Sequence, residues 1–160
     1  MQPQGTKIIC AGAIVLVQPS EGGKLKVLGL VREQSGRLEI GPKGGVRRGE
    51  YIADCAAREA HEELGFRVDI DAGQVFTTNV EPHQDLEAGM SDFGFGTTTI
   101  HYFLARISEE QLKSFRRSEE HVGYQLLGFE EMMMILNRHS RTREVNLLKK
   151  VQRAVEHTSE

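Results

Sequence analysis

The chain has 160 residues, of which 39% are hydrophobic and 27% charged, enough for one sizeable core and too few for two ordinary domains. Twenty lysines and arginines against 23 aspartates and glutamates give a formal net charge of -3, which disfavours nucleic-acid or membrane binding through overall charge. Two cysteines cannot build a disulfide framework, and no apolar run approaches the roughly 20 residues that span a bilayer. We expect one domain over residues 1–160, with frayed termini, in the reducing cytoplasm.

The first part of the chain predicts a hairpin, a glycine-rich loop and one helix. In chain order we expect strands over 6–18 and 24–32, a short extended segment over 37–40 and a helix over 51–64. Turn-forming residues at 19–23 join the two strands into a hairpin. Glycines punctuate the loop over 41–45, and Gly65 is placed to end the helix as a left-handed C-cap.

The second part of the chain predicts more strands and two or three helices. We expect strands over 66–70, 73–80, 97–107 and 123–129, and helices near 108–111, 130–136 and from 140 onward. Ser108 has capping-box spacing to Gln111, and Ser140 is placed to N-cap the last helix. Segment 81–96 carries one proline, four acidic residues and several glycines, which indicates a long surface loop. The irregular alternation favours an α/β fold, a mixed sheet flanked by helices.

The helix over 51–64 carries three carboxylates close to its apolar face. On a helical wheel of about 100° per residue, Glu59, Glu62 and Glu63 fall within about 100° of one another, and Glu63 intrudes on the apolar stripe. Neighbouring anions repel, and a carboxylate at a buried edge is costly unless it is compensated. A hard divalent cation such as Mg²⁺ would solve both problems. Arg58 and Glu50 are spaced to form an ion pair that holds the preceding loop to the helix.

The alternative is a solvent-exposed helix face on which glutamates form ion pairs with basic residues four positions away. The spacing of the whole segment argues against this alternative. From Gly44 the chain reads GGVRRGEYIADCAAREAHEELGF, which fits G-x5-E-x7-R-E-U-x-E-E-x-G-U, where U is apolar. The fixed positions are Gly44, Glu50, Arg58, Glu59, Glu62, Glu63 and Gly65, and the apolar positions are Ala60 and Phe66. This pattern is the Nudix box, so the chain resembles the Nudix hydrolases.

The resemblance implies a fold, a reaction class and a set of site residues. The family fold is an α/β/α sandwich around a central mixed β-sheet, and its members cut a nucleoside diphosphate linked to another group. By this resemblance the box glutamates bind Mg²⁺ or Mn²⁺, and Lys43 and Gly44 begin a loop that positions phosphates. Metals and Lys43 would stabilise the phosphoryl transition state while a carboxylate takes a proton from an acidified water. The catalytic set expected from it includes Glu63 and Arg58.

A second stretch narrows the resemblance. Residues 117–131 are similar to the "LSHEHQAYRWLGLEE" region of asymmetric diadenosine tetraphosphate hydrolases, residues 99–105 to their "TVIYWLA" strand, and residues 42–44 to their "PKG". Carried over, Glu120 becomes a glutamate outside the box that acts as metal ligand or general base. Tyr102 and Tyr124 match tyrosines near the nucleotide, where a ring can stack on adenine. The alternatives are a surface carboxylate for Glu120 and sheet packing for each tyrosine.

Other residues differ from the pattern or stay outside it. Thr98 stands where a phosphate-contacting lysine is usual, and an aromatic residue that often precedes the PKG loop is replaced by Leu38 or Glu39. Arg47 and Arg48 are extra cations that suit a longer polyphosphate, an inositol pyrophosphate or an RNA 5′ end, or that are simply solvated. Three histidines are expected to be structural, because Mg²⁺ prefers oxygen ligands: His61, His101 and His121.

The leading hypothesis is therefore a Mg²⁺-dependent or Mn²⁺-dependent pyrophosphohydrolase that cuts diadenosine tetraphosphate to ATP and AMP. Glu59, Glu62, Glu63 and Glu120 would hold metals, with Glu63 or Glu120 as the base. The alternatives are hydrolysis of diphosphoinositol polyphosphates, removal of pyrophosphate from RNA 5′ ends, and a Nudix-fold module that binds a nucleotide without cleaving it. We expect a small-molecule nucleotide substrate, no membrane, no obligate nucleic-acid partner and a monomer.

Overall fold

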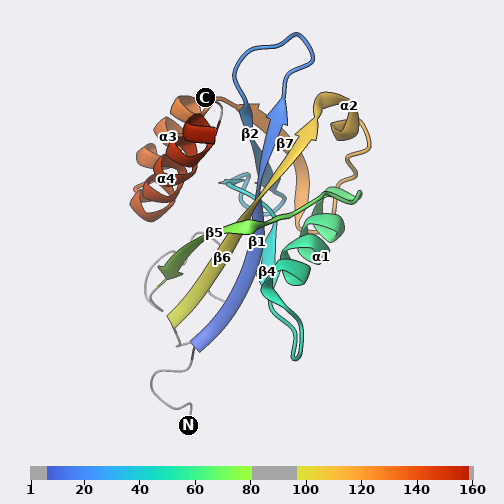
Figure 1. Ribbon diagram of the computed structural model, residues 1–160, viewed down its shortest axis with the longest axis vertical. Coiled ribbons are helices and arrows are strands. Elements are labelled where there is room, and N and C mark those ends of the chain that lie inside the picture. The colour runs from blue at the N-terminus through green and yellow to red at the C-terminus, as the bar shows by residue number, and fades with distance from the viewer. Residues whose placement is uncertain (1–6, 81–96, 159–160) are drawn as a thin grey trace.

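The computed structural model describes residues 7–80 and 97–158, and the predicted loop over 81–96 lies outside them (Figure 1). The elements in chain order are β1 (Lys7–Gln18), β2 (Lys26–Arg32), β3 (Leu38–Glu39), β4 (Lys43–Gly45), α1 (Ile52–Leu64), β5 (Asp71–Val80), β6 (Thr97–Ser108), α2 (Glu109–Leu112), β7 (His121–Leu127), α3 (Phe129–Arg138) and α4 (Thr142–Thr158). Most of the predicted strands and helices are thus confirmed to within a few residues.

The strands form one mixed sheet with the order β3-β2-β1-β6-β5, to which β4 adds on β1 and β7 on β2. β1 and β6 are parallel over their whole length, from the pair Lys7 and Thr97 to the pair Gln18 and Ser108, and the other pairings are antiparallel. β1 is rich in buried β-branched and aliphatic side chains, which suits a central strand covered on both faces.

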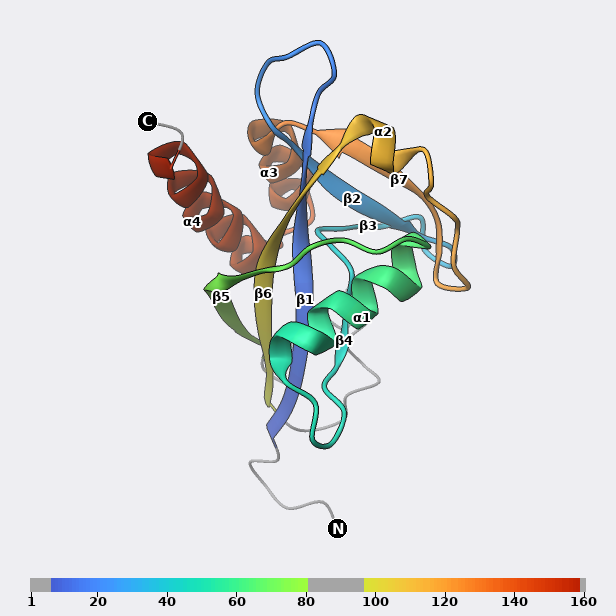
Figure 2. The ribbon, with the colours of Figure 1, turned by 45° about the vertical axis from the view of Figure 1, so that its right-hand side comes forward.

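Helices cover both faces of this sheet, so the expected α/β/α sandwich is confirmed. Figure 2 shows α1 on one face and the pair α3 and α4 on the other. The core on the α3 and α4 side includes Ile14, Met132, Leu136 and Leu148, whereas alanines and Leu64 of α1 pack on the opposite face. No helix within residues 7–80 and 97–158 is long and apolar enough to cross a membrane.

Three local predictions are wrong. Residues 66–70 are not a strand: Val68 is buried and Phe66 and Ile70 half-buried against the core under α1, so their alternation reflects packing without strand pairing. β7 begins at His121 and ends at Leu127, so Phe129 belongs to α3. Ser140 lies two residues before α4 and has a positive φ of 57°, so it does not cap that helix. The capping box at Ser108 and the left-handed Gly65 are confirmed.

Candidate functional site

A glycine-rich strand lies directly against the acidic face of α1. β4 pairs with β1 through Gly44 and its two neighbours, so the loop backbone passes close to the helix. A Cβ on Gly44 would overlap the Glu59 carboxyl group, so any larger residue there would displace this carboxylate from its place. The fixed glycine of the box is therefore explained by the approach of a carboxylate to the loop backbone.

Arg58 joins the loop to the helix, as its spacing from Glu50 predicts. Its Nε and Nη2 donate to the two Glu50 carboxylate oxygens at 2.9 and 3.0 Å, Nη2 also donates to the Gly45 carbonyl at 3.1 Å, and Nη1 donates to Glu59 Oε1 at 2.8 Å. The hydrogen bonds that Glu50 accepts from Arg58 are the main cause that lowers the pKa of Glu50 to about 2, and the one from the Arg47 backbone N–H is the next. The arrangement makes Arg58 a residue that positions the loop and Glu59, with its donors directed at the protein.

The three box carboxylates differ in burial. The side chains of Glu59 and Glu63 are 14% and 7% exposed, whereas that of Glu62 is 52% exposed and lies 3.5 Å from Arg58. Burial raises the pKa of Glu63 to about 9; Lys43 opposes this, and Glu59 and other carboxylates add to it. Burial also raises the pKa of Glu59. Glu63 is therefore the costliest anion of the set, as its place on the helical wheel indicates.

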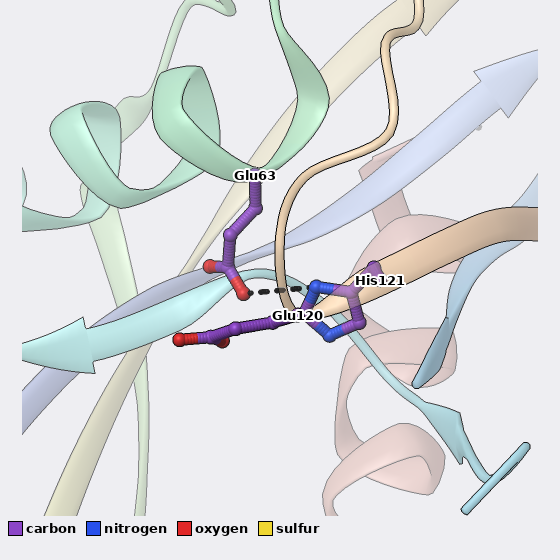
Figure 3. A group of neighbouring side chains, drawn as sticks. All are labelled: Glu63, Glu120 and His121. Carbon is purple, nitrogen blue, oxygen red and sulfur yellow. Dashed lines mark ion pairs between the residues drawn. The ribbon is translucent and has the colours of Figure 1, made fainter. Parts of the chain in front are cut away.

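Glu120 joins this group from a distant part of the chain. Figure 3 shows its side chain beside Glu63 and His121, with both carboxyl groups on the same side of the imidazole ring. One ligand atom from each of the three residues lies within 4.8 Å of the others. Glu120 itself is exposed, directly before β7. The structure thus brings together the carboxylates that the box and the second stretch of resemblance single out.

Glu39 is a charged residue of this region to which the sequence analysis assigned no role. It is 4% exposed, and Arg32 Nη1 and Lys43 Nζ lie 2.7 and 3.3 Å from its two carboxylate oxygens. Burial alone would raise the pKa of Glu39, but Lys43, His121 and Arg32 outweigh it and hold the pKa far below its usual range. The available signal was a lone acid between Leu38 and Ile40, next to the glycine loop.

Lys43 lies in the same region and is mostly covered, with 14% of its side chain exposed. Burial would lower the pKa of Lys43, but Tyr102, Glu39, Glu144 and Glu63 act against it and hold the pKa above its usual range. The amine is therefore a fixed positive charge beside the carboxylates, on the strand that contains Gly44.

The two predicted tyrosines lie in different environments. Tyr102 is 1% exposed and belongs to the core on the α3 and α4 side, so in this conformation its ring has no free face for a base. Tyr124 is 38% exposed on β7, and its ring lies edge-on to Phe115 with the centroids 4.9 Å apart. Of the two, Tyr124 offers a surface for stacking.

The residues that depart from the family pattern lie in different places. Thr98, which stands where a lysine is usual, is buried, whereas the extra cations Arg47 and Arg48 are exposed.

The residues present fit a divalent cation. Glu63 Oε2 is buried and has no hydrogen-bond partner in the part of the chain that the structure describes. A buried unpartnered carboxylate oxygen is costly, and a cation bound to it would remove that cost. The surrounding donors are carboxylate oxygens, which Mg²⁺ and Mn²⁺ accept, and Glu59, Glu62 and Glu120 lie on the same helix or beside it.

The part of the chain that the structure describes also contains two cavities away from the carboxylates. Cavities of about 420 and 580 Å³ open around the turn between β1 and β2, one of them reaching α4 at Val155 and the other the start of α2 at Glu109. None of the predicted site residues lines either cavity. The candidate site is thus the carboxylate cluster itself.

Comparisons with known proteins agree with this geometry. In structure the chain is similar to a C. elegans Ap4A hydrolase binary complex, with 20% identity, a TM-score of 0.72 and coverage of 94% of this chain and 98% of that one. It is also similar to a MutT protein from Methanosarcina mazei Go1, with 19% identity, a TM-score of 0.66 and coverage of 96% of this chain and 98% of that one. A third similar structure is the E. coli dihydroneopterin triphosphate pyrophosphohydrolase, with 17% identity, a TM-score of 0.59 and coverage of 89% of this chain and 92% of that one. At these identities the likeness concerns the fold. The search of curated proteins found no match.

The family assignment comes from the sequence itself. Residues 9–148 match the NUDIX domain, a span that runs from β1 into α4 and contains the box, Lys43 and Glu120. The chain therefore belongs to the NUDIX domain family and is a Nudix hydrolase, an enzyme that acts on phosphoric anhydride bonds.

Proposed function

We propose that this Nudix hydrolase cleaves dinucleoside polyphosphates such as diadenosine tetraphosphate to ATP and AMP, with Mg²⁺ or Mn²⁺ as its metal. The observation that carries the proposal is the buried Glu63 carboxylate, which lies beside Glu120 and close enough to Lys43 to feel its charge, while Glu59 of the same helix lies against Gly44. A polyphosphate chain needs such a combination of cations and backbone N–H groups, because its charge is spread over several oxygens.

Each residue has a role in this proposal. Glu59, Glu62, Glu63 and Glu120 would hold the metal, which supplies positive charge to the phosphate oxygens and makes a water molecule more acidic. Glu63 or Glu120 takes a proton as the water oxygen attacks one phosphorus in line and the phosphoric anhydride bond on its far side breaks. Lys43 stabilises the developing negative charge, and Arg58 keeps the loop and Glu59 in place.

The choice of substrate rests on residues outside the box. The stretch 117–131 resembles asymmetric diadenosine tetraphosphate hydrolases, and the C. elegans Ap4A hydrolase has a similar fold. Tyr124 is the candidate for stacking on an adenine. A contact between Tyr102 and the base would require the side chains that cover its ring to move.

The test is a substrate panel with Mg²⁺ or Mn²⁺: diadenosine tetraphosphate, a diphosphoinositol polyphosphate and a 5′-triphosphate RNA. We expect fast turnover of the first, with ATP and AMP as products, and loss of turnover on adding a chelator. Turnover of only the second or third substrate would contradict the proposal and assign a role to the exposed Arg47 and Arg48. Tight nucleotide binding without metal-dependent hydrolysis would instead identify a binding module.

The cysteines bear on where the protein works. Cys10 and Cys55 are both free and buried, which supports a reducing compartment, and we place the protein in the cytoplasm as a monomer. Imaging of a tagged chain in cells would test the location. Light scattering on the eluting peak of a size-exclusion column would test the monomer, since a mass near twice 17.9 kDa would contradict it.

A further inference from the structure

His121 is a fully buried histidine whose position is fixed by its backbone. It is 0% exposed and begins β7, where it pairs with Arg32 at an irregularity in the strand ladder. Its backbone N–H donates to Ser118 Oγ at 3.1 Å, and its carbonyl accepts from the Ser118 N–H at 3.2 Å. The backbone from which the imidazole projects into the carboxylate cluster is therefore held in place by hydrogen bonds.

The ring lies between two buried carboxylates. Nδ1 is 3.5 Å from Glu63 Oε1, and Nε2 is 3.5 Å from Glu39 Oε2, while Figure 3 shows the contact with Glu63. Both nitrogens are fully covered, and neither has a hydrogen bond of ordinary length within the described residues. A shift of a few tenths of an ångström would give the ring a hydrogen bond on either side.

Glu39 is the anchored end of this arrangement. Arg32 on β2 and Lys43 on β4 hold its carboxylate at 2.7 and 3.3 Å. A line of contacts therefore runs from the sheet through Glu39 and His121 to Glu63 on α1. Carboxylates that bind metals are commonly held by such outer partners, which fix the direction of the free lone pairs.

We propose that His121, held by Glu39, is a positioning residue that fixes the carboxylate of Glu63 for the metal, and that it does not bind the metal itself. Both ring nitrogens already face carboxylates. Glu63 turns Oε1 toward the ring and leaves the buried Oε2 without a hydrogen-bond partner in the described part of the chain, so Oε2 is free to bind a cation. This inference rests on the proposed metal-dependent function, because it needs a cation at Glu63. Its rival is direct coordination through His121 Nδ1, which lies within the 4.8 Å group.

The first measurement is electron spin echo spectroscopy of the folded wild-type protein loaded with Mn²⁺, which detects the nitrogen of a directly coordinated imidazole. We expect no such nitrogen signal. A signal that disappears in His121→Phe would make His121 a ligand and overturn the proposal.

The second measurement is the Mn²⁺ affinity of purified variants, followed by the EPR signal of free Mn²⁺, with circular dichroism as the check on folding. His121→Phe, which loses both contacts, should bind Mn²⁺ about 10- to 100-fold more weakly. His121→Asn should recover part of this loss, because its amide N–H₂ can still donate toward Glu63. Glu39→Gln should weaken binding about 10-fold through the freed ring.

The matched control is His101→Phe, another histidine on a strand, whose Nδ1 lies 3.0 Å from Thr77 Oγ1. It should bind Mn²⁺ as the wild type does. Wild-type affinity in His121→Phe would overturn the proposal, and if that variant fails to fold, wild-type affinity in Glu39→Gln would do so. Absence of any Mn²⁺ binding by the wild type would overturn both this inference and the proposed function, whereas the other outcomes leave the proposed function intact.

Discussion

Two clusters of buried charge, one at the start of α4 and one beside α1, differ in how completely they are satisfied. Arg141, directly before α4, and Glu144, on α4, are 5% and 3% exposed, and Arg141 donates to both Glu144 carboxylate oxygens and to the Leu38 carbonyl. Beside α1, by contrast, Glu63 Oε2 and both ring nitrogens of His121 have no hydrogen-bond partner among the described residues.

The difference separates two uses of buried charge. A buried ion pair whose charged groups are hydrogen-bonded to each other needs no ligand, and Arg141 also links the start of α4 to β3. A cluster that leaves a carboxylate oxygen unpartnered is costly to the fold and is ready to receive a cation. The first cluster should therefore matter for stability and the second for chemistry, and four experiments test this difference.

The largest effect should come from Glu63→Gln. The amide keeps the size of the side chain but loses the negative charge, so a metal ligand and a candidate base are removed together. We expect kcat on diadenosine tetraphosphate to fall about 10³-fold or more, since positioned general bases alone contribute roughly 10² to 10⁴. Circular dichroism should show a native fold. Near wild-type turnover in this variant would refute the role of Glu63.

The next effect concerns the cluster on α4. Arg141→Met removes the close partner of the buried Glu144 carboxylate and leaves the more distant Arg143, whose Nη2 lies 3.7 Å from Glu144 Oε1, so the free energy of unfolding in urea should fall by about 3 kcal/mol. The double variant Arg141→Met with Glu144→Leu should recover most of this loss, because it removes both charges. Activity per folded molecule should remain in the wild-type range. A single variant that loses less than about 1 kcal/mol would erase the contrast.

A pH series distinguishes Glu63, which lacks a full set of partners, from an ion-paired carboxylate by the sign of the effect on stability. The pKa of Glu63, raised by burial to about 9 from 4.5, means that folding favours its neutral form, so its stabilising contribution is complete below pH 4.5 and is lost as the pH rises toward 9. Metal-free Glu63→Gln should therefore lose less stability than the wild type between pH 5 and pH 9. We expect a difference of at least about 1.4 kcal/mol, or roughly 3 to 6 °C in Tm, measured by calorimetry with a chelator present.

Glu50 supplies the control of opposite sign. Arg58 lowers the pKa of Glu50 to about 2, so its contribution is present above pH 4.5 and is lost as the pH falls toward 2. Glu50→Gln should therefore lower the Tm at neutral pH and have less effect in acid. If the Tm of the wild type and that of Glu63→Gln changed with pH in the same way, Glu63 would ionise in the folded protein as it does in the unfolded chain.

The smallest effect should come from Tyr124→Leu. Stacking of a base on an aromatic ring is worth roughly 1 to 3 kcal/mol, so KM for diadenosine tetraphosphate should rise about 10-fold with kcat little changed. Tyr124→Phe keeps the ring and should behave as the wild type. Tyr51→Ala, at an exposed aromatic residue on the loop before α1, is the control. An unchanged KM in Tyr124→Leu would remove Tyr124 from the substrate contacts.

The sequence predicted the part of the site that lies within one helix. The places of Glu59, Glu62 and Glu63 on α1 follow from helical geometry alone, and the spacing of Arg58 and Glu50 predicted their ion pair. The fold class could also be predicted, because the strand and helix patterns and the box agreed with each other.

What the sequence did not predict depends on pairing between distant strands. The contacts of Glu39 arise because β3 and β7 both pair with β2, and the latter pairing shifts register between Val31 and Arg32. No local pattern reports such a register. The burial of Tyr102 likewise depends on how α3 and α4 pack on the sheet, and residues 66–70 alternate like a strand without pairing as one.

The parallel pairing of β1 with β6 has a consequence for biosynthesis. β1 is made first, yet the strand that covers its whole length ends only at Ser108. A ribosome that has just completed α1 has therefore produced all the box glutamates, while Glu120 and the β6 ladder are still to be translated. During that interval the β6 edge of β1 has no partner, although β2 and β4 can already pair with β1, as expected for folding with many non-local contacts. The proposed metal site would therefore be complete only after Glu120 has been translated.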